Sequence, residues 1–259
     1  MQGVASFPFI SRVGMNSCFG PDCKDLIFES TEHSATMIYL SGLVGFLLVL
    51  TAEARIGNSS HLQFCTDTEQ CLLFDLICKT DNYEVRHYDS VKWVSTEENS
   101  SFMEIATMRA FKRLFNYITG ANENGKKIKM TAPVLIKIFE NKSFWQTGTY
   151  TLSFLLPSEE QTNPPKPSDN KVYIHHTADM KVYVQTYGGW MTSLSDKNKA
   201  SSLSSALDSA GAEYNKGFHY AAGYNSPMTI FNRHNEVWFV AEDDPVCPSS
   251  EEMNSSPLF

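Results

Sequence analysis

The chain has 259 residues, enough for one large domain or two small ones, and 42% of them are hydrophobic. Its formal net charge of −8 argues against a nucleic-acid-binding protein, because such proteins neutralise phosphates with Lys and Arg. It also lacks a G-x-S-x-G nucleophile motif, an H-E-x-x-H zinc helix, a P-loop and a dinucleotide-binding fingerprint. We therefore expect an acidic globular protein that is not an enzyme.

An uncharged apolar segment, "MIYLSGLVGFLLVL" at residues 37–50, follows a long lead. It is shorter than the roughly 20 residues that span a bilayer. Ala52 and Ala54 then form the A-x-A pattern of a secretory signal peptide, so cleavage after Ala54 is predicted. Glu29 and Glu32, rather than basic residues, precede the segment. A start at Met37, an uncleaved membrane anchor and a buried helix therefore stay open as alternatives.

Four cysteines remain after such a cleavage, Cys65, Cys71, Cys78 and Cys247. They allow three pairings, and sequence does not choose among them. One pairing closes a short loop between Cys65 and Cys71 and ties the start of the domain to its end through Cys78 and Cys247. Glycosylation sequons occur at Asn58, Asn99, Asn141 and Asn254. We predict a secreted, disulfide-bonded glycoprotein; a membrane-anchored protein is the alternative, and a cytoplasmic one is less favoured.

The pattern divides the chain into four parts. Residues 1–54 are an extension with the signal-like segment, 55–79 a polar and loose cysteine-bearing lead-in, 80–242 the folded domain and 243–259 a polar tail.

The first half of the domain begins with strands. In "YEVRHY", Tyr83, Val85 and His87 share one face of a strand, and Glu84, Arg86 and Tyr88 share the other. A helix follows, with Ser101 and Glu104 as a capping box and Gly120 as its end. Its apolar positions, Met108, Phe111, Phe115 and Ile118, indicate a core-facing stripe rather than a cofactor wall. Two further strands are predicted over residues 128–139 and 149–157.

After a proline-rich break at residues 158–170 the order strand, helix, strand, strand returns. Trp93 and Trp190, and likewise Pro133 and Pro227, lie roughly 95 residues apart. We infer a duplicated β-α-β-β unit, with both prolines at edge or bulge positions. The predicted fold is α+β, a distorted antiparallel barrel from two repeats with two flanking helices.

These blocks resemble the SOUL/heme-binding-protein family over residues 82–241. The similarity is carried by "YEVRHYDSVKWVST", "KIKMTAPV", "FLLPSEEQTNPPKP", "GGW" and "AAGYNSPMTIFNRHNEVWFV". The resemblance implies a two-half distorted barrel that binds heme or a related tetrapyrrole and has no enzymatic activity. In the SOUL branch the histidine of the "RHY" block has been assigned as the axial heme ligand, which points to His87. Other members bind through an apolar cleft without that ligand.

The candidate heme-binding residues are therefore His87, Arg86, Phe111, Phe115 and Met108. Neutral imidazole is a good axial ligand, although a histidine hydrogen-bonded within the core is the simpler interpretation of the pattern. Arg86 and the lysines of the "NGKKIKM" turn are candidates for the propionates.

The predicted function is reversible heme binding by a secreted domain. The alternative is an extracellular protein- or lipid-interaction module, with a membrane contact only if residues 37–50 are retained. The sequence does not predict an oligomeric state.

Overall fold

The computed structural model describes residues 55–140 and 147–247. The signal-like segment, Asn141 and Asn254 lie outside them. The strands in chain order are β1 (Ile56–Asn58), β2 (Gln70–Leu72), β3 (Asp75–Lys79), β4 (Glu84–Tyr88), β5 (Val91–Ser100), β6 (Val134–Phe139), β7 (Gly148–Leu155), β8 (Val172–Thr177), β9 (Met180–Tyr187), β10 (Phe218–Gly223) and β11 (Asn235–Val240). The helices are α2 (Met103–Ile118) and α3 (Ser193–Ser209), with short 3-10 turns η1 (Ser59–His61) and η2 (Ser158–Glu160).

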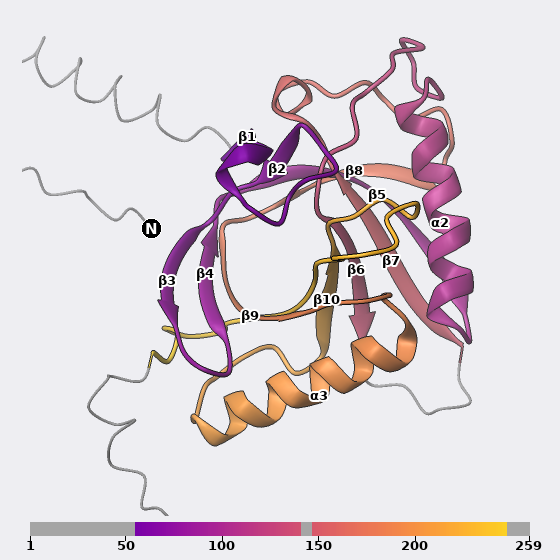
Figure 1. The fold of residues 1–259 in the computed structure, drawn as a ribbon. Helices are drawn as coiled ribbons and strands as arrows, with labels where there is room; N and C mark the ends of the chain where they lie inside the picture. Colours follow the sequence, from indigo (N-terminus) through magenta and orange to yellow (C-terminus); the bar gives the residue numbers. More distant parts are fainter. Residues whose placement is uncertain (1–54, 141–146, 248–259) are drawn as a thin grey trace, which may run out of the picture. The chain divides into compact units, whose positions relative to one another are not determined.

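Nine strands form one antiparallel sheet in the order β3-β4-β9-β11-β10-β6-β7-β5-β8. Figure 1 shows that the sheet is curled, with α2 and α3 on its outside. No pairing joins the end strands β3 and β8 among the described residues, so the sheet is curled but its ladder is not closed. The predicted α+β class is confirmed, and the closed barrel stays a prediction.

The strand order is symmetric about the boundary between β10 and β6. β10, β11, β9 and β4 follow one another on one side of this boundary, and β6, β7, β5 and β8 follow one another on the other side. The first repeat is β4, β5, α2, β6 and β7, and the second is β8, β9, α3, β10 and β11. The first strand of each repeat, β4 or β8, pairs with a strand of the other repeat. The duplication is present, but each unit is β-β-α-β-β rather than the predicted β-α-β-β.

The residues that suggested the duplication are not equivalent in space. Trp93 is buried within β5, whereas Trp190 follows β9 and is exposed. Pro133 precedes β6, whereas Pro227 follows β10 in the loop before β11. Neither proline lies within a strand, so their predicted equivalent edge or bulge positions are wrong.

Both helices pack on the same face of the sheet. Ala110 and Leu114 of α2 share a core with Ile136, and Leu203 of α3 shares one with Val237. We call the opposite face, which carries the core residues Trp93, Leu135 and Trp238, the inner face. Within the described residues no helix is long and apolar enough to cross a membrane.

The predicted capping box of Ser101 and Glu104 at the start of α2 is wrong. α2 begins after Phe102, which makes no side-chain cap, and a capping box occurs instead at Thr192 and Ser195 of α3. Glu104 accepts hydrogen bonds from the backbone and hydroxyl of Ser193, at 2.8 and 2.7 Å. It therefore caps the neighbouring helix rather than its own, and it joins the two helix N-termini.

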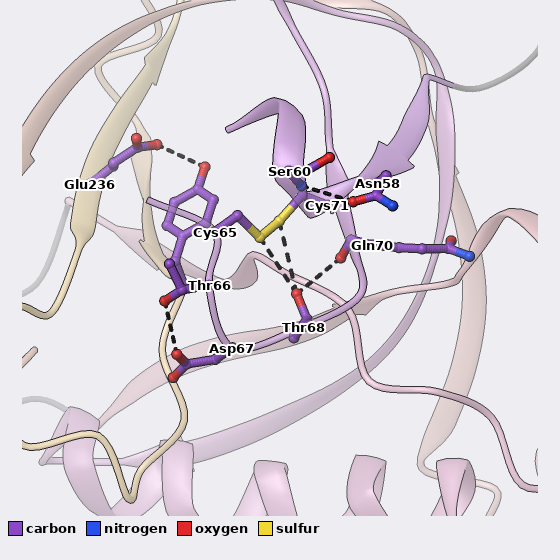
Figure 2. The surroundings of a disulfide bond; sticks show 10 residues. Asn58, Ser60, Cys65, Thr66, Asp67, Thr68, Gln70, Cys71 and Glu236 are labelled. Carbon is purple, nitrogen blue, oxygen red and sulfur yellow. Dashed lines mark hydrogen bonds between the residues drawn. A yellow bond between two sulfur atoms is a disulfide. The ribbon is translucent and has the colours of Figure 1, made fainter. Parts of the chain in front are cut away.

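The lead-in is ordered rather than loose. β1 pairs with β2, and Phe64, Cys71 and Leu72 contribute to the core below the inner face. Cys65 is bonded to Cys71 and Cys78 to Cys247, which is one of the three pairings open from the sequence. Figure 2 shows the first disulfide beside the Thr68 hydroxyl, which donates to the Gln70 carbonyl at 3.0 Å.

Candidate functional site

Large apolar side chains lie among the polar ones on the solvent side of α2. Its core side carries small or aliphatic residues such as Ala106, Ala110 and Leu114, all buried. The predicted core stripe is wrong for two of its four members, because Met108 is 67% and Phe115 47% exposed, whereas Ile118 is buried and Phe111 packs against the core. We define the α2 outer face by four side chains that a helix of 3.6 residues per turn places on its solvent side, Ile105, Met108, Phe111 and Phe115.

The α2 outer face is joined to the core through one ring. Phe111 is half-buried, packs edge-on against Phe154 at 5.1 Å and stacks on Phe115 at 6.0 Å. Phe115 therefore has a fixed neighbour although it faces solvent. An exposed cluster of large apolar side chains on one helix costs solubility, which points to a ligand or partner surface.

Cations border this surface. Lys112 is exposed and lies between Met108 and Phe115 on the same side of the helix. Arg109 is also largely exposed, and its guanidinium is 3.6 Å from Glu98. An apolar surface with a few cations suits a flat apolar ligand that carries carboxylates. Two of the "NGKKIKM" lysines, Lys126 and Lys129, pair with Glu160 and Glu69, whereas Lys127 is exposed.

His87 lies on the face of the sheet that carries the helices, among charged side chains. The sequence placed its face correctly, since Tyr83 and Val85 pack in the α3 core and Tyr88 packs on the inner side. Its side chain is 28% exposed, and its Nε2 is 3.5 Å from Asp179. Its direct cross-strand neighbours are Asp75 and Lys181. Tyr83 and Val85 are buried, so the apolar side chains that share the face of His87 are not open to a macrocycle.

Arg86 is an interior residue, contrary to the prediction that it serves a ligand. It is 2% exposed and lies 4.0 Å from the centre of the Phe74 ring. It donates to Glu84 at 2.7 Å, to Glu236 at 3.0 Å and to the Tyr88 hydroxyl at 3.2 Å. Its charge is therefore already neutralised inside the protein.

Glu236 is the centre of this interior arrangement, which we call the arginine–glutamate network (Arg86, Glu84, Glu236). Glu236 is fully buried and also accepts hydrogen bonds from Tyr224, Trp238 and His234 at 3.0, 2.7 and 2.7 Å. Burial alone would raise the pKa of Glu236, but the Arg86 charge and the His234 hydrogen bond outweigh burial, so its pKa lies below its usual value. The carboxylate is stable in the core because every side of it is occupied.

Two other histidines have structural partners. His175 points inward with Nδ1 at 3.0 Å from Ser95, whereas the adjacent strand residue His176 is exposed, so the two face opposite ways. His219 is buried between Asp196, at 2.9 Å, and Glu140. It thus links β10 to α3 and to the end of β6 and is not free to ligate iron.

The His219 link predicts a loss of stability in alkali. Burial by itself would lower the pKa of His219, but hydrogen bonds to Asp196 and Glu140 raise it to about 9. A histidine whose folded pKa is raised stabilises the fold fully below its unfolded pKa of about 6.5 and loses that contribution as the pH rises through about 9. We expect a loss of roughly 3 kcal/mol across this range.

Urea unfolding of the wild type and of His219→Gln at pH 6 and pH 9.5 measures this contribution. The two proteins should differ at pH 6 and converge at pH 9.5. His176→Gln, at an exposed histidine, should follow the wild type throughout. A difference between wild type and His219→Gln that does not change with pH would contradict the prediction.

Comparison with known proteins agrees with the sequence blocks. The family model described as "SOUL heme-binding protein" matches residues 69–240. The chain belongs to the SOUL heme-binding protein family. It is 38% identical to human heme-binding protein 2 over 63% of this chain and 80% of that protein, and 36% identical to the mouse protein over 66% and 83%. Mouse heme-binding protein 1 is 30% identical over 61% of this chain and 84% of its own length.

Proposed function

We propose that this chain binds heme or a related tetrapyrrole without catalysing a reaction, and that the macrocycle rests on the α2 outer face. The observation that carries the proposal is the exposure of Met108 and Phe115 beside Lys112. Membership of a heme-binding protein family supports the ligand class.

The physical fit is that of a flat amphipathic ligand. Each apolar side chain covered by the porphyrin adds about 1.5–3 kcal/mol when its burial is complete. Lys112 and Arg109 are placed to meet propionates, which stay at the edge of the apolar patch. The Met108 thioether is a further group that iron accepts.

Titration of the full chain with hemin, followed by the Soret band, tests the proposal. The double variant Met108→Ser/Phe115→Ser should weaken binding at least tenfold, because two contacts of the apolar surface are lost. Leu76→Ser/Ile77→Ser is the matched control, since these β3 side chains are 53% and 44% exposed. Equal hemin affinity of the wild type and the α2 variant would refute this location.

His87 as iron ligand is the alternative proposal, and it rests on the family resemblance and on its partly exposed ring. His87→Ala should then change the Soret position, whereas His176→Ala should not. If the α2 outer face supplies the affinity, His87→Ala should leave the dissociation constant within about threefold of the wild type.

We also propose that the protein is extracellular. Two disulfides and the exposed sequon residues Asn58 and Asn99 support this. Protein purified from its source should lose mass on enzymatic removal of N-glycans and should begin near Arg55; an unprocessed, unglycosylated chain would count against it.

A further inference from the structure

A row of four side chains crosses the inner face on directly paired strands. Glu97 on β5 is opposite Thr151 on β7, Thr151 is opposite Lys137 on β6, and Lys137 is opposite Tyr220 on β10. Directly opposite residues point to the same side of a sheet. The row lies on the face away from the helices, beyond the apolar core around Trp93 and Leu135, and it is distinct from the α2 outer face.

Lys137 in this row has no ion pair and no hydrogen bond among the described residues. Its Nζ lies instead over two rings, 3.8 Å from the centre of Phe218 and 5.1 Å from that of Phe139. The nearest carboxylate in the row, Glu97, is two strands away, or about 10 Å between backbones at the usual strand spacing. A half-buried ammonium usually has a carboxylate partner, so Lys137 is unusual.

The groups around Lys137 also have unused hydrogen-bonding capacity. The Tyr220 hydroxyl, on the adjacent strand, has no hydrogen-bond partner among the described residues. His175 uses Nδ1 on Ser95, and Ser95 in turn donates to Ser153 at 2.7 Å, which leaves the second ring nitrogen of His175 available. Phe218 packs edge-on against Phe139 at 6.3 Å and against the Tyr220 ring at 5.4 Å, so apolar walls stand beside the Tyr220 hydroxyl.

We propose that this inner-face cluster is a second binding site, for a small carboxylate with an aromatic body. The carboxylate would pair with the Lys137 ammonium and accept from the Tyr220 hydroxyl, and its ring would lie against Phe139 and Phe218. A lysine offers three donors in one point charge, which suits a carboxylate that arrives without a fixed plane.

The electrostatics of the cluster agree with this assignment. Burial lowers the pKa of Lys137, and the charge of Glu97 offsets this only in part. Burial lowers the pKa of His175 as well, aided by the charge of Lys137. The Lys137 charge is thus only partly compensated by Glu97, and a carboxylate beside it would stabilise the charged form further.

Calorimetric titration of the full chain with 2-naphthoate, and with neutral 2-naphthamide, tests the site. The wild type should bind one 2-naphthoate with a dissociation constant below about 1 mM, and 2-naphthamide at least tenfold more weakly. Lys137→Met keeps the apolar stem but removes the charge, so it should weaken 2-naphthoate binding at least tenfold. Without ligand it should unfold at the same urea concentration as the wild type or a higher one.

Lys216→Met is the matched control. Lys216 also lies over a ring, 5.1 Å from Tyr214, but it is exposed and pairs with Asp208 at 3.0 Å. This variant and Met108→Ser/Phe115→Ser should bind 2-naphthoate like the wild type. No saturable binding by the wild type, equal binding of the amide, equal binding by Lys137→Met, or loss of binding in the α2 variant would each overturn the proposal. If Lys137→Met does not fold, Lys137→Arg and the amide comparison decide it.

Discussion

Replacing Glu236 with glutamine is expected to lower the free energy of unfolding by about 3–5 kcal/mol. The carboxylate is fully buried and accepts from four donors, including Arg86. A glutamine amide has one acceptor oxygen, and its NH2 group would face donors that need an acceptor. Arg86 would keep only Glu84 as a charged partner. Urea unfolding at pH 7 measures the loss as a lower midpoint with an unchanged slope.

A double-mutant cycle separates the Arg86–Glu236 interaction energy from the contributions of the neighbouring residues. Arg86→Met/Glu236→Gln should be more stable than the sum of the two single losses predicts, because the second change removes the charge stranded by the first. Lys79→Met breaks the exposed pair with Glu84, whose nitrogen–oxygen distance is 2.9 Å, and should cost less than about 1 kcal/mol. A loss of less than about 1 kcal/mol in Glu236→Gln would show that the network does not stabilise the fold.

Removing the Cys78–Cys247 disulfide should have a similarly large effect. The bond joins β3 to the segment after β11 across a sequence separation of 169 residues. The chain-entropy model gives about 5 kcal/mol for a loop of this length, and we expect a loss of 3–5 kcal/mol in Cys78→Ser/Cys247→Ser. The reason is that the cross-link restricts the unfolded chain, while Cys247 itself is exposed and contributes little to packing.

The shorter disulfide provides the comparison. Cys65 and Cys71 are six residues apart, so the same model gives only about 2–3 kcal/mol for Cys65→Ala/Cys71→Ala. Unfolding in urea without reductant measures both variants. Equal stability of the Cys78→Ser/Cys247→Ser variant and the wild type would contradict the prediction. Non-covalent contacts, such as the hydrogen bond from the Tyr83 hydroxyl to the Val246 carbonyl, would then be sufficient to hold the segment around Val246.

The strand containing His87 shows what sequence alone predicts well. Alternation with a period of two assigns Val85 and Arg86 to opposite faces, and the structure agrees. The same pattern does not reveal that Arg86 is buried, because its partner Glu236 is 150 residues away. Nothing local to "YEVRHY" distinguishes an interior arginine from a surface one.

Helix α2 shows the opposite difficulty. It has two apolar faces, and the one with the larger side chains was predicted to be the core. The core side instead uses Ala106 and Ala110, which let the helix approach the sheet closely. The larger Met108 and Phe115 are left in solvent. The exposed apolar face, the feature on which the proposed function depends, becomes visible only once the helix is docked.

The most direct test of the α2 outer face as the heme site is the methionine methyl NMR spectrum of the full chain during addition of ferric hemin. Met108 lies on the α2 outer face, whereas Met180 is directly opposite Tyr88, within one residue of His87 along β4 but on the inner face of the sheet. We predict that the Met108 signal shifts and broadens in step with the Soret change while the Met180 signal persists. Loss of the Met180 signal with an unchanged Met108 signal would contradict the account and would place the macrocycle near β4 rather than on α2.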